Sequence, residues 1–276
     1  MWNVLKKAGQ DWLRHRSPRL GAALAYYTVF SLGPLLLIVT AVAGFFLGPD
    51  AVRGTLSAEY YALLGESGGQ AVDAMLQGAA DTSSGPLAAI SGTVLLLVAA
   101  LGIVVQLKDA LNTIWEVDDE ASGGVQWYLR TYLISMAGVL GLGFLLAASL
   151  VLSTGLAAFT GTLGMGPAAG LLWQAADVVI STAVLAILFA MLFKYFPDAH
   201  VQWRHVWFAG LLTALLFQAG KLAIAWYIGT QGLESTYGAA ASVVVLLIWV
   251  YYAAQIVLFG AEVAHVSATT ELSAKS

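Results

Sequence analysis

The chain has 276 residues, of which 59% are hydrophobic and only 10% are charged, and its formal net charge is −4. Soluble domains carry about 25% charged residues, so this composition excludes an ordinary water-soluble protein and indicates an integral membrane protein. The sequence contains no cysteine, which excludes disulfides and thiolate metal sites, and its negative net charge does not suggest a nucleic-acid partner.

Residues 1–19 combine basic side chains with an apolar stripe. Leu5, Ala8 and Trp12 recur at helical spacing, with lysine and arginine elsewhere in the segment. This pattern predicts an amphipathic helix on the cytoplasmic surface of a membrane. A basic patch for nucleic acid is the weaker alternative. The apolar run that follows is longer than the core of a secretory signal, so we interpret it as a retained span.

Six apolar stretches are long enough to cross the hydrocarbon core of a bilayer, which takes about 20 residues. They predict an all-α, polytopic membrane protein with six transmembrane helices, built as a single domain over residues 1–276. The stretches are residues 20–47, 86–107, 128–152, 168–193, 206–228 and 241–263.

The orientation of the spans follows from lysine and arginine, which concentrate in cytoplasmic loops. All of the 12 lysine and arginine residues except Arg53 and Lys221 fall on the side of the chain termini. We therefore expect both termini to be cytoplasmic, with residues 264–276 as a cytoplasmic tail.

The first span contains the stretch AALAYYTVFSLGPLLL, residues 22–37. Pro34 lacks a backbone N–H and follows Gly33, so the helix should kink near its middle. The carbonyl freed by the kink must face protein or water rather than lipid. We therefore expect Tyr26, Tyr27 and Ser31, which lie one to two turns before the break, to line the interior of the bundle.

Residues 49–85 form a long loop that the predicted orientation places in the periplasm. The loop reads as two short amphipathic helices separated by the turn sequence GESGG, and most of its charged residues are acidic. Two interpretations remain open: a solvated cap, or a lid over an outward opening. The apolar faces are formed by Val52, Leu56, Leu63 and Leu64 in the first helix and by Val72, Met75, Leu76 and Ala79 in the second.

Two ionisable residues lie inside predicted spans, Asp177 in the fourth and Lys221 in the fifth. Gln174 and Gln218 lie one helical turn from them on the same faces, so we expect a cluster between adjacent antiparallel helices. The cluster is either an ion pair that holds two helices together or the lining of a substrate and ion pathway. In a pathway, the substitution Lys221→Met should abolish activity and leave folding intact.

A second polar set gathers near the predicted cytoplasmic face. Asp109 and Asn112 share a helix face after the second span, Arg130 opens the third span, and Glu262 closes the sixth. We expect these four residues to form a buried, gate-like polar network. For Lys108 and Glu116 an ordinary solvated helix end is favoured, with surface ion pairs worth under about 1 kcal/mol each.

The motifs of soluble enzymes are missing from the sequence. There is no H-E-x-x-H, no G-x-S-x-G and no phosphate-binding G-x-x-x-x-G-K-[ST]. None of the histidines pairs with a carboxylate at the spacing of metal ligands; they are His15, His200, His205 and His265. We therefore expect no catalytic residue, no metal and no cofactor, and an intramembrane enzyme is disfavoured.

Four segments together resemble the YihY/BrkB family of bacterial inner-membrane proteins, once mislabelled ribonuclease BN. They are AALAYYTVFSLGPLLL, LKDALNTIWEV, FKYFPDAHVQWRHVWFAGLLTALL and YGAAASVVVLLIWVYYAAQIVLFGAE. The resemblance covers residues 20–262 and implies six spans with cytoplasmic termini in the bacterial inner membrane. The positions that match its motifs are Tyr26, Tyr27, Ser31, Pro34, Asn112, Trp115, Pro197, Trp203, Tyr237, Gly238, Trp249, Tyr251, Gly260 and Glu262.

The resemblance also suggests export of a lipid or an amphipathic solute. Our first hypothesis is a transporter that moves a lipid-linked or polar organic solute outward, with membrane lipids and that solute as its partners. The alternative is a non-transporting scaffold or assembly factor of the cell envelope, with the acidic loop as its interaction surface. No nucleic-acid partner is expected, and a homo-oligomer is left open.

Overall fold

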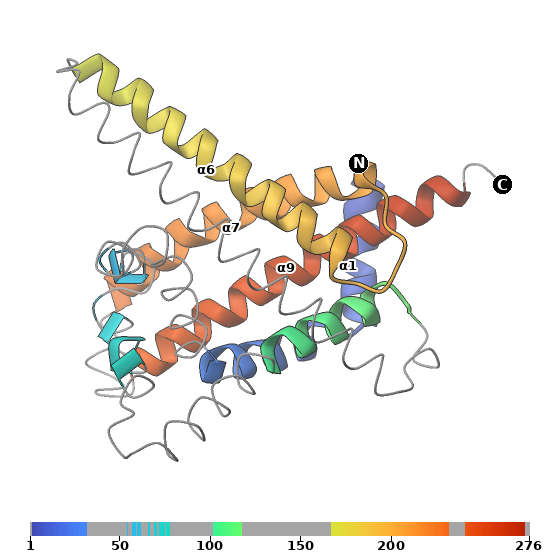
Figure 1. Ribbon diagram of the computed structural model, residues 1–276, viewed down its shortest axis with the longest axis horizontal. Helices are drawn as coiled ribbons and strands as arrows, with labels where there is room; N and C mark the ends of the chain where they lie inside the picture. Colours follow the sequence, from blue (N-terminus) through green and yellow to red (C-terminus); the bar gives the residue numbers. More distant parts are fainter. Residues whose placement is uncertain are drawn as a thin grey trace, which may run out of the picture.

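Figure 1 shows a computed structural model of the protein, in which long helices pack side by side. The structure describes residues 2–31, 102–117, 167–231 and 241–273, together with thirteen positions between 54 and 77. Within the long helices, the side chains of residues 167–177, 224–231, 241–242 and 271–273 lie outside this description. The described part of the chain is helical and contains no strand, which confirms the predicted all-α class.

Three of the helices are long and apolar enough to cross a membrane: α6 (Pro167–Tyr195), α7 (Trp203–Gln231) and α9 (Ala241–Ser273). Their qualifying segments are Val178–Tyr195, Trp203–Ala223 and Val243–Thr270. They correspond to the last three predicted spans. The first span is helical over residues 20–31, and most of the second and the whole third lie outside the described residues, so the total of six spans stays a prediction.

The helix α9 continues to Ser273, ten residues beyond the predicted end of the last span. Ala264, His265 and Val266 in this extension are buried. Much of the predicted cytoplasmic tail is therefore a packed continuation of α9.

The pair α6 and α7 forms an antiparallel hairpin, joined by residues 196–202. A Cβ atom added to Gly210 of α7 would lie 2.6 Å from the carbonyl oxygen of Ala186 and 2.9 Å from the amide nitrogen of Ala190. The two backbones can approach this closely because small residues line the contact. Lys194 Nζ donates to the carbonyl oxygen of Val201 at 2.8 Å and fixes the connection.

A helix of residues 17–31 packs against α9 through small side chains. Ser17, Gly21 and Ala25, spaced four residues apart, are all buried. The side chain of Gln255 on α9 lies directly against Gly21, where any larger residue would collide with it. This small-residue stripe brings the two helices close together, as such stripes commonly do in membrane proteins.

The helix α1 (Trp2–Arg14) is amphipathic, as predicted, and crosses the last turns of α9 (Figure 1). Ala8 is fully buried, and Val4 and Leu5 pack against the same core. That core also takes in Leu111 and Ile114 of the helix formed by residues 102–114, with side chains from α6, α7 and α9. We call this region the α1 end of the bundle; here the apolar face of α1 packs against the protein itself.

A second apolar cluster lies elsewhere in the bundle. Val72, from the long loop, is 1% exposed and is buried together with Val29, Leu246 and Trp249. Nearby, the hydroxyls of Tyr60 and Tyr61 both donate to the carboxylate of Asp73, the latter at 2.7 Å. This part of the loop therefore packs on the bundle instead of standing free in solvent.

Candidate functional site

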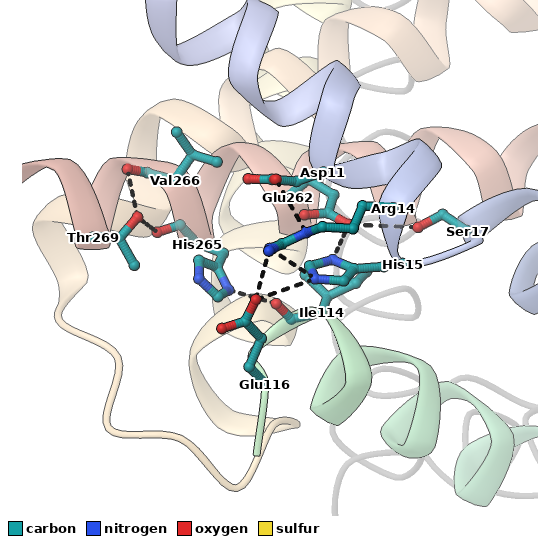
Figure 2. A network of polar contacts seen from close by, with 10 residues as sticks. All are labelled: Asp11, Arg14, His15, Ser17, Ile114, Glu116, Glu262, His265, Val266 and Thr269. Carbon is teal, nitrogen blue, oxygen red and sulfur yellow. Dashed lines mark hydrogen bonds and ion pairs between the residues drawn. The ribbon is translucent and has the colours of Figure 1, made fainter. Parts of the chain in front are cut away.

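A network of polar side chains joins three separate segments at the α1 end (Figure 2). It connects the end of α1, the end of the 102–114 helix and the last turns of α9. We call it the His15 network; its members are Arg14, His15, Ser17, Glu116 and Glu262.

A tight turn after α1 brings His15 back towards α9. Arg16 has a left-handed backbone with φ of 56°, and its amide donates to the carbonyl oxygen of Leu13 at 3.1 Å. Helices commonly end with such a residue, usually glycine. The turn lets the next helix begin at Ser17, so His15 and Ser17 both reach the same carboxylate on α9.

The helix of residues 102–114 ends in a similar way. Glu116 has φ of 51°, and the amide of Val117 donates to the carbonyl oxygen of Asn112 at 3.0 Å. This is the hydrogen-bond pattern of a helix C-terminus that usually carries glycine at the left-handed position. Here the position is a glutamate, whose side chain joins the network.

Glu262 lies at the centre of the network and is 0% exposed. His15 Nδ1 lies 2.8 Å from Glu262 Oε1, and Ser17 Oγ donates to the same oxygen at 3.5 Å. The other carboxylate oxygen, Oε2, is buried and has no hydrogen-bond partner within the described part of the chain. A buried carboxylate with an unpaired oxygen is costly for the fold, so this position calls for a functional explanation.

Glu116 lies at the outer edge of the network, with 54% of its side chain exposed. It accepts a hydrogen bond from Arg14 Nη2 at 2.6 Å, and its Oε1 lies within hydrogen-bond distance of His15 Nε2, at 3.4 Å. Partial burial would raise the pKa of Glu116, but the hydrogen bond from His15 and the nearby Arg14 guanidinium outweigh it and hold the pKa below its ordinary value. The imidazole of His15 thus bridges two carboxylates, one buried and one exposed.

His265 holds the 102–117 segment against α9 beside the network. Its Nδ1 hydrogen-bonds to the carbonyl oxygen of Ile114, and its ring stacks on Trp115 with the centroids 5.2 Å apart. This contact fixes the end of the helix from which Glu116 projects.

A separate clamp lies on the neighbouring loop. Asn112 donates to Asp198 Oδ2 at 3.0 Å and accepts from the Asp198 amide at 2.8 Å, while Lys108 Nζ lies 2.9 Å from Asp198 Oδ1. Lys108 is only 6% exposed. The prediction of solvated helix-end residues is therefore wrong for Lys108, because the α6–α7 connection folds over it. Glu116 is exposed and forms a surface ion pair with Arg14, as predicted.

The predicted gate network is divided between these two clusters. Glu262 belongs to the His15 network, whereas Asn112 bonds to Asp198 and Asp109 is exposed. Arg130 lies outside the described residues. No histidine stands at metal-ligand spacing from a carboxylate in the sequence, but folding joins His15 to Glu262 across 247 positions.

The predicted cluster between the fourth and fifth spans is partly described. Gln218 of α7 donates to Ser181 of α6 at 3.2 Å, and Lys221 is half-buried. Because the two helices run antiparallel, this contact puts position 177 level with Lys221. The side chains of Gln174 and Asp177 lie outside the described residues, so their pairing stays a prediction.

Three residues of the first span are predicted to line the interior of the bundle, and the structure describes how exposed each of them is. Ser31 is fully buried, but Tyr26 and Tyr27 are 59% and 42% exposed. The buried face of this helix carries Ala25 and Ser31. The interior lining predicted for the two tyrosines stays a prediction. The predicted kink at Gly33 and Pro34 lies outside the described residues.

No group of three or more histidine and carboxylate side chains in the described ranges is arranged to hold a metal ion. Sequence reasoning found Glu262 as a charged residue at the end of an apolar span but assigned it other partners. The available signal for His15 was its place directly after an amphipathic helix and before a small-residue stripe.

Comparison with known proteins identifies the family of the chain. Residues 8–276 match the model of the family described as Virulence factor BrkB. The chain belongs to the BrkB family. Among its relatives, the UPF0761 membrane protein of Verminephrobacter eiseniae is 33% identical over 264 residues, which cover 91% of this chain. UPF0761 membrane proteins of Pseudomonas aeruginosa and Ralstonia nicotianae are 29% and 28% identical, over 89% and 95% of this chain.

This BrkB-family chain spans less than two thirds of the length of these relatives: 59%, 58% and 59%, respectively. No solved structure is similar to the chain. The comparisons therefore establish a membrane protein of the BrkB family, and the activity has to be argued from the site.

Proposed function

We propose that this BrkB-family chain is a transporter of the bacterial inner membrane that exports a lipid-linked or polar organic solute. The α1 end would face the cytoplasm, and the chain would catalyse no covalent chemistry. The observation that carries the proposal is Glu262, a fully buried carboxylate in an apolar helix with one oxygen unpaired in the described structure.

A purely structural role explains Glu262 poorly. A carboxylate inside a membrane helix costs several kcal/mol, and a fold selected for stability alone would pair both oxygens or use an apolar residue. Ionisable residues inside transmembrane segments commonly mark substrate, ion or proton pathways. The unpaired oxygen of Glu262 fits that role.

The His15 network supports the proposal as a closure at the cytoplasmic side. It connects α1, the end of the 102–114 helix and α9 through side-chain hydrogen bonds and ion pairs. Two of its backbone turns, at Arg16 and Glu116, use left-handed residues other than glycine. Such strained positions cluster in parts of proteins that switch between states, so the network is a suitable gate.

The test is flux in liposomes that contain the purified protein. The probes are a fluorescent phospholipid and three radiolabelled polar solutes: a sugar, an amino acid and a quaternary ammonium compound. We expect protein-dependent movement of at least one probe, and strong loss of that movement in Glu262→Gln. The matched control is Glu66→Gln, because Glu66 is an exposed residue of the long loop.

If every probe crosses protein-containing liposomes no faster than it crosses empty liposomes, the proposal is contradicted. Equal flux in Glu262→Gln and the wild type would also contradict it, since Glu262 carries the argument. If flux is absent and deletion of residues 55–80 removes binding of envelope proteins, the scaffold function replaces the transporter.

A further inference from the structure

The His15 network contains a continuous hydrogen-bonded path from solvent to the buried carboxylate. Glu116 is 54% exposed, the His15 side chain 10% and Glu262 0%. The two ring nitrogens of His15 face the two carboxylates, Nδ1 at 2.8 Å from Glu262 and Nε2 at 3.4 Å from Glu116. We propose that Glu116, His15 and Glu262 form a proton relay that loads Glu262 from the solvent at the α1 end.

Histidine suits this position because its ring can accept a proton at one nitrogen and release one from the other. In the starting state, His15 is neutral and donates its Nδ1 proton to ionised Glu262. A protonated Glu116 gives its proton to Nε2, and the imidazolium then gives its Nδ1 proton to Glu262. Glu262 ends as a neutral acid, Glu116 as a carboxylate and His15 with its proton on Nε2. Loss of that proton from Nε2 and uptake of another at Nδ1 restores the first tautomer.

The charged surroundings of the path come from each element packed against it. From α1, Asp11 lies beside Arg14, with Nε to Oδ1 at 3.4 Å. Arg14 in turn reaches Glu116, and His265 approaches from α9 with its ring centroid 6.4 Å from that of His15. Arg14 favours an ionised Glu116, so a Glu116 that has taken up a proton gives it readily to His15 Nε2.

The far side of Glu262 offers an onward direction. Its Oε2 atom is buried without a partner in the described structure, and so are both amide atoms of Gln255. Gln255 precedes Glu262 by two helical turns on the same face of α9, towards the middle of the bundle. Two unsatisfied polar side chains on one buried face indicate a polar route that continues beyond Glu262.

This inference rests on the proposed function for its purpose: a proton bound at Glu262 would be the ion that drives export. The relay itself can be tested without any substrate. Infrared difference spectra of the purified protein between acidic and neutral pH should show the C=O stretch of a protonated carboxyl group. That band should be absent in Glu262→Gln and unchanged in Glu66→Gln.

The kinetic test is the rate at which the Glu262 band forms after a pH jump. Because the side chain of His15 carries the proton, His15→Phe should slow the formation of the band by about tenfold or more without removing the band. Glu116→Gln should also slow the band, and this exposed substitution keeps the test valid if His15→Phe does not fold. The matched control is His200→Gln, since His200 is exposed on the neighbouring loop.

The relay is refuted if no band depends on Glu262, or if His15→Phe and Glu116→Gln both load Glu262 at the wild-type rate. Flux without a Glu262 band would refute the relay and leave the transporter standing. If Glu262 takes up its proton through His15 but no probe shows flux, the relay is supported and the transporter is contradicted.

Discussion

At the scale of single residues, the two left-handed positions are the least expected feature of the network. Arg16 and Glu116 flank His15 in space, and neither is glycine. A side chain in this conformation costs about 1–2 kcal/mol. The fold therefore tolerates strain in both turns that hold the path from Glu116 to Glu262, which fits a region that has to rearrange.

Replacing Arg16 by glycine should release part of this strain. We expect Arg16→Gly to raise the free energy of unfolding by up to about 1 kcal/mol, because glycine adopts the left-handed conformation without steric cost. Arg19→Gly is the matched control. Arg19 lies inside the following helix, so glycine there should lower the free energy of unfolding by about 1 kcal/mol. Thermal unfolding in detergent measures both, and a destabilised Arg16→Gly protein would contradict the strain argument.

The contact of Glu116 with Arg14 and His15 should make stability depend on pH. Its pKa is lower in the folded protein than the ordinary value of 4.5, so the stabilisation is present above that value. It is lost as the pH falls through the lowered folded pKa. We expect wild type to unfold at a higher temperature than Glu116→Gln at pH 6 and the difference to vanish in strong acid; a difference that persists there would contradict this assignment.

At the scale of elements, close helix pairs depend on particular glycines. Gly210 lies against the backbone of Ala186 and Ala190, and backbone atoms cannot move aside as a flexible side chain can. Gly9 of α1 has nothing within 4 Å of the place where a side chain would start. The two positions provide opposite expectations for the same substitution.

We expect Gly210→Ala to destabilise the protein by about 1–3 kcal/mol, because the added methyl group forces α6 and α7 apart. Gly9→Ala should instead stabilise α1 by about 0.5–1 kcal/mol, because alanine is the better helix former. Unfolding of both variants in the same detergent provides the comparison. Equal effects of the two substitutions would show that the α6–α7 contact is looser than described.

Composition was sufficient to predict the helices α6, α7 and α9, since long apolar runs have few other stable forms in a membrane. It missed the continuation of α9 to Ser273, where alanine and threonine lower the hydropathy without ending the helix. The His15 network could not be predicted in the same way. It depends on a left-handed turn at Arg16 and on a contact between positions 247 residues apart, and neither leaves a periodic signal.

At the scale of the whole molecule, proton loading from the cytoplasm requires the α1 end to face that side of the membrane. The chain has no cysteine, so single cysteines can be introduced without background labelling. With a thiol reagent that cannot cross the membrane, Glu66→Cys should react in intact spheroplasts and Gln10→Cys only after lysis. Both positions are exposed, and the reverse result would invert the predicted orientation.

The central claim is that Glu262 is the proton-binding centre of a transporter. The most direct measurement is flux of the transported probe into or out of liposomes with and without an imposed pH gradient. We expect the gradient to accelerate flux several-fold in wild type and Glu66→Gln, and residual flux in Glu262→Gln not to respond to it. A gradient response in Glu262→Gln equal to that of wild type would contradict the claim.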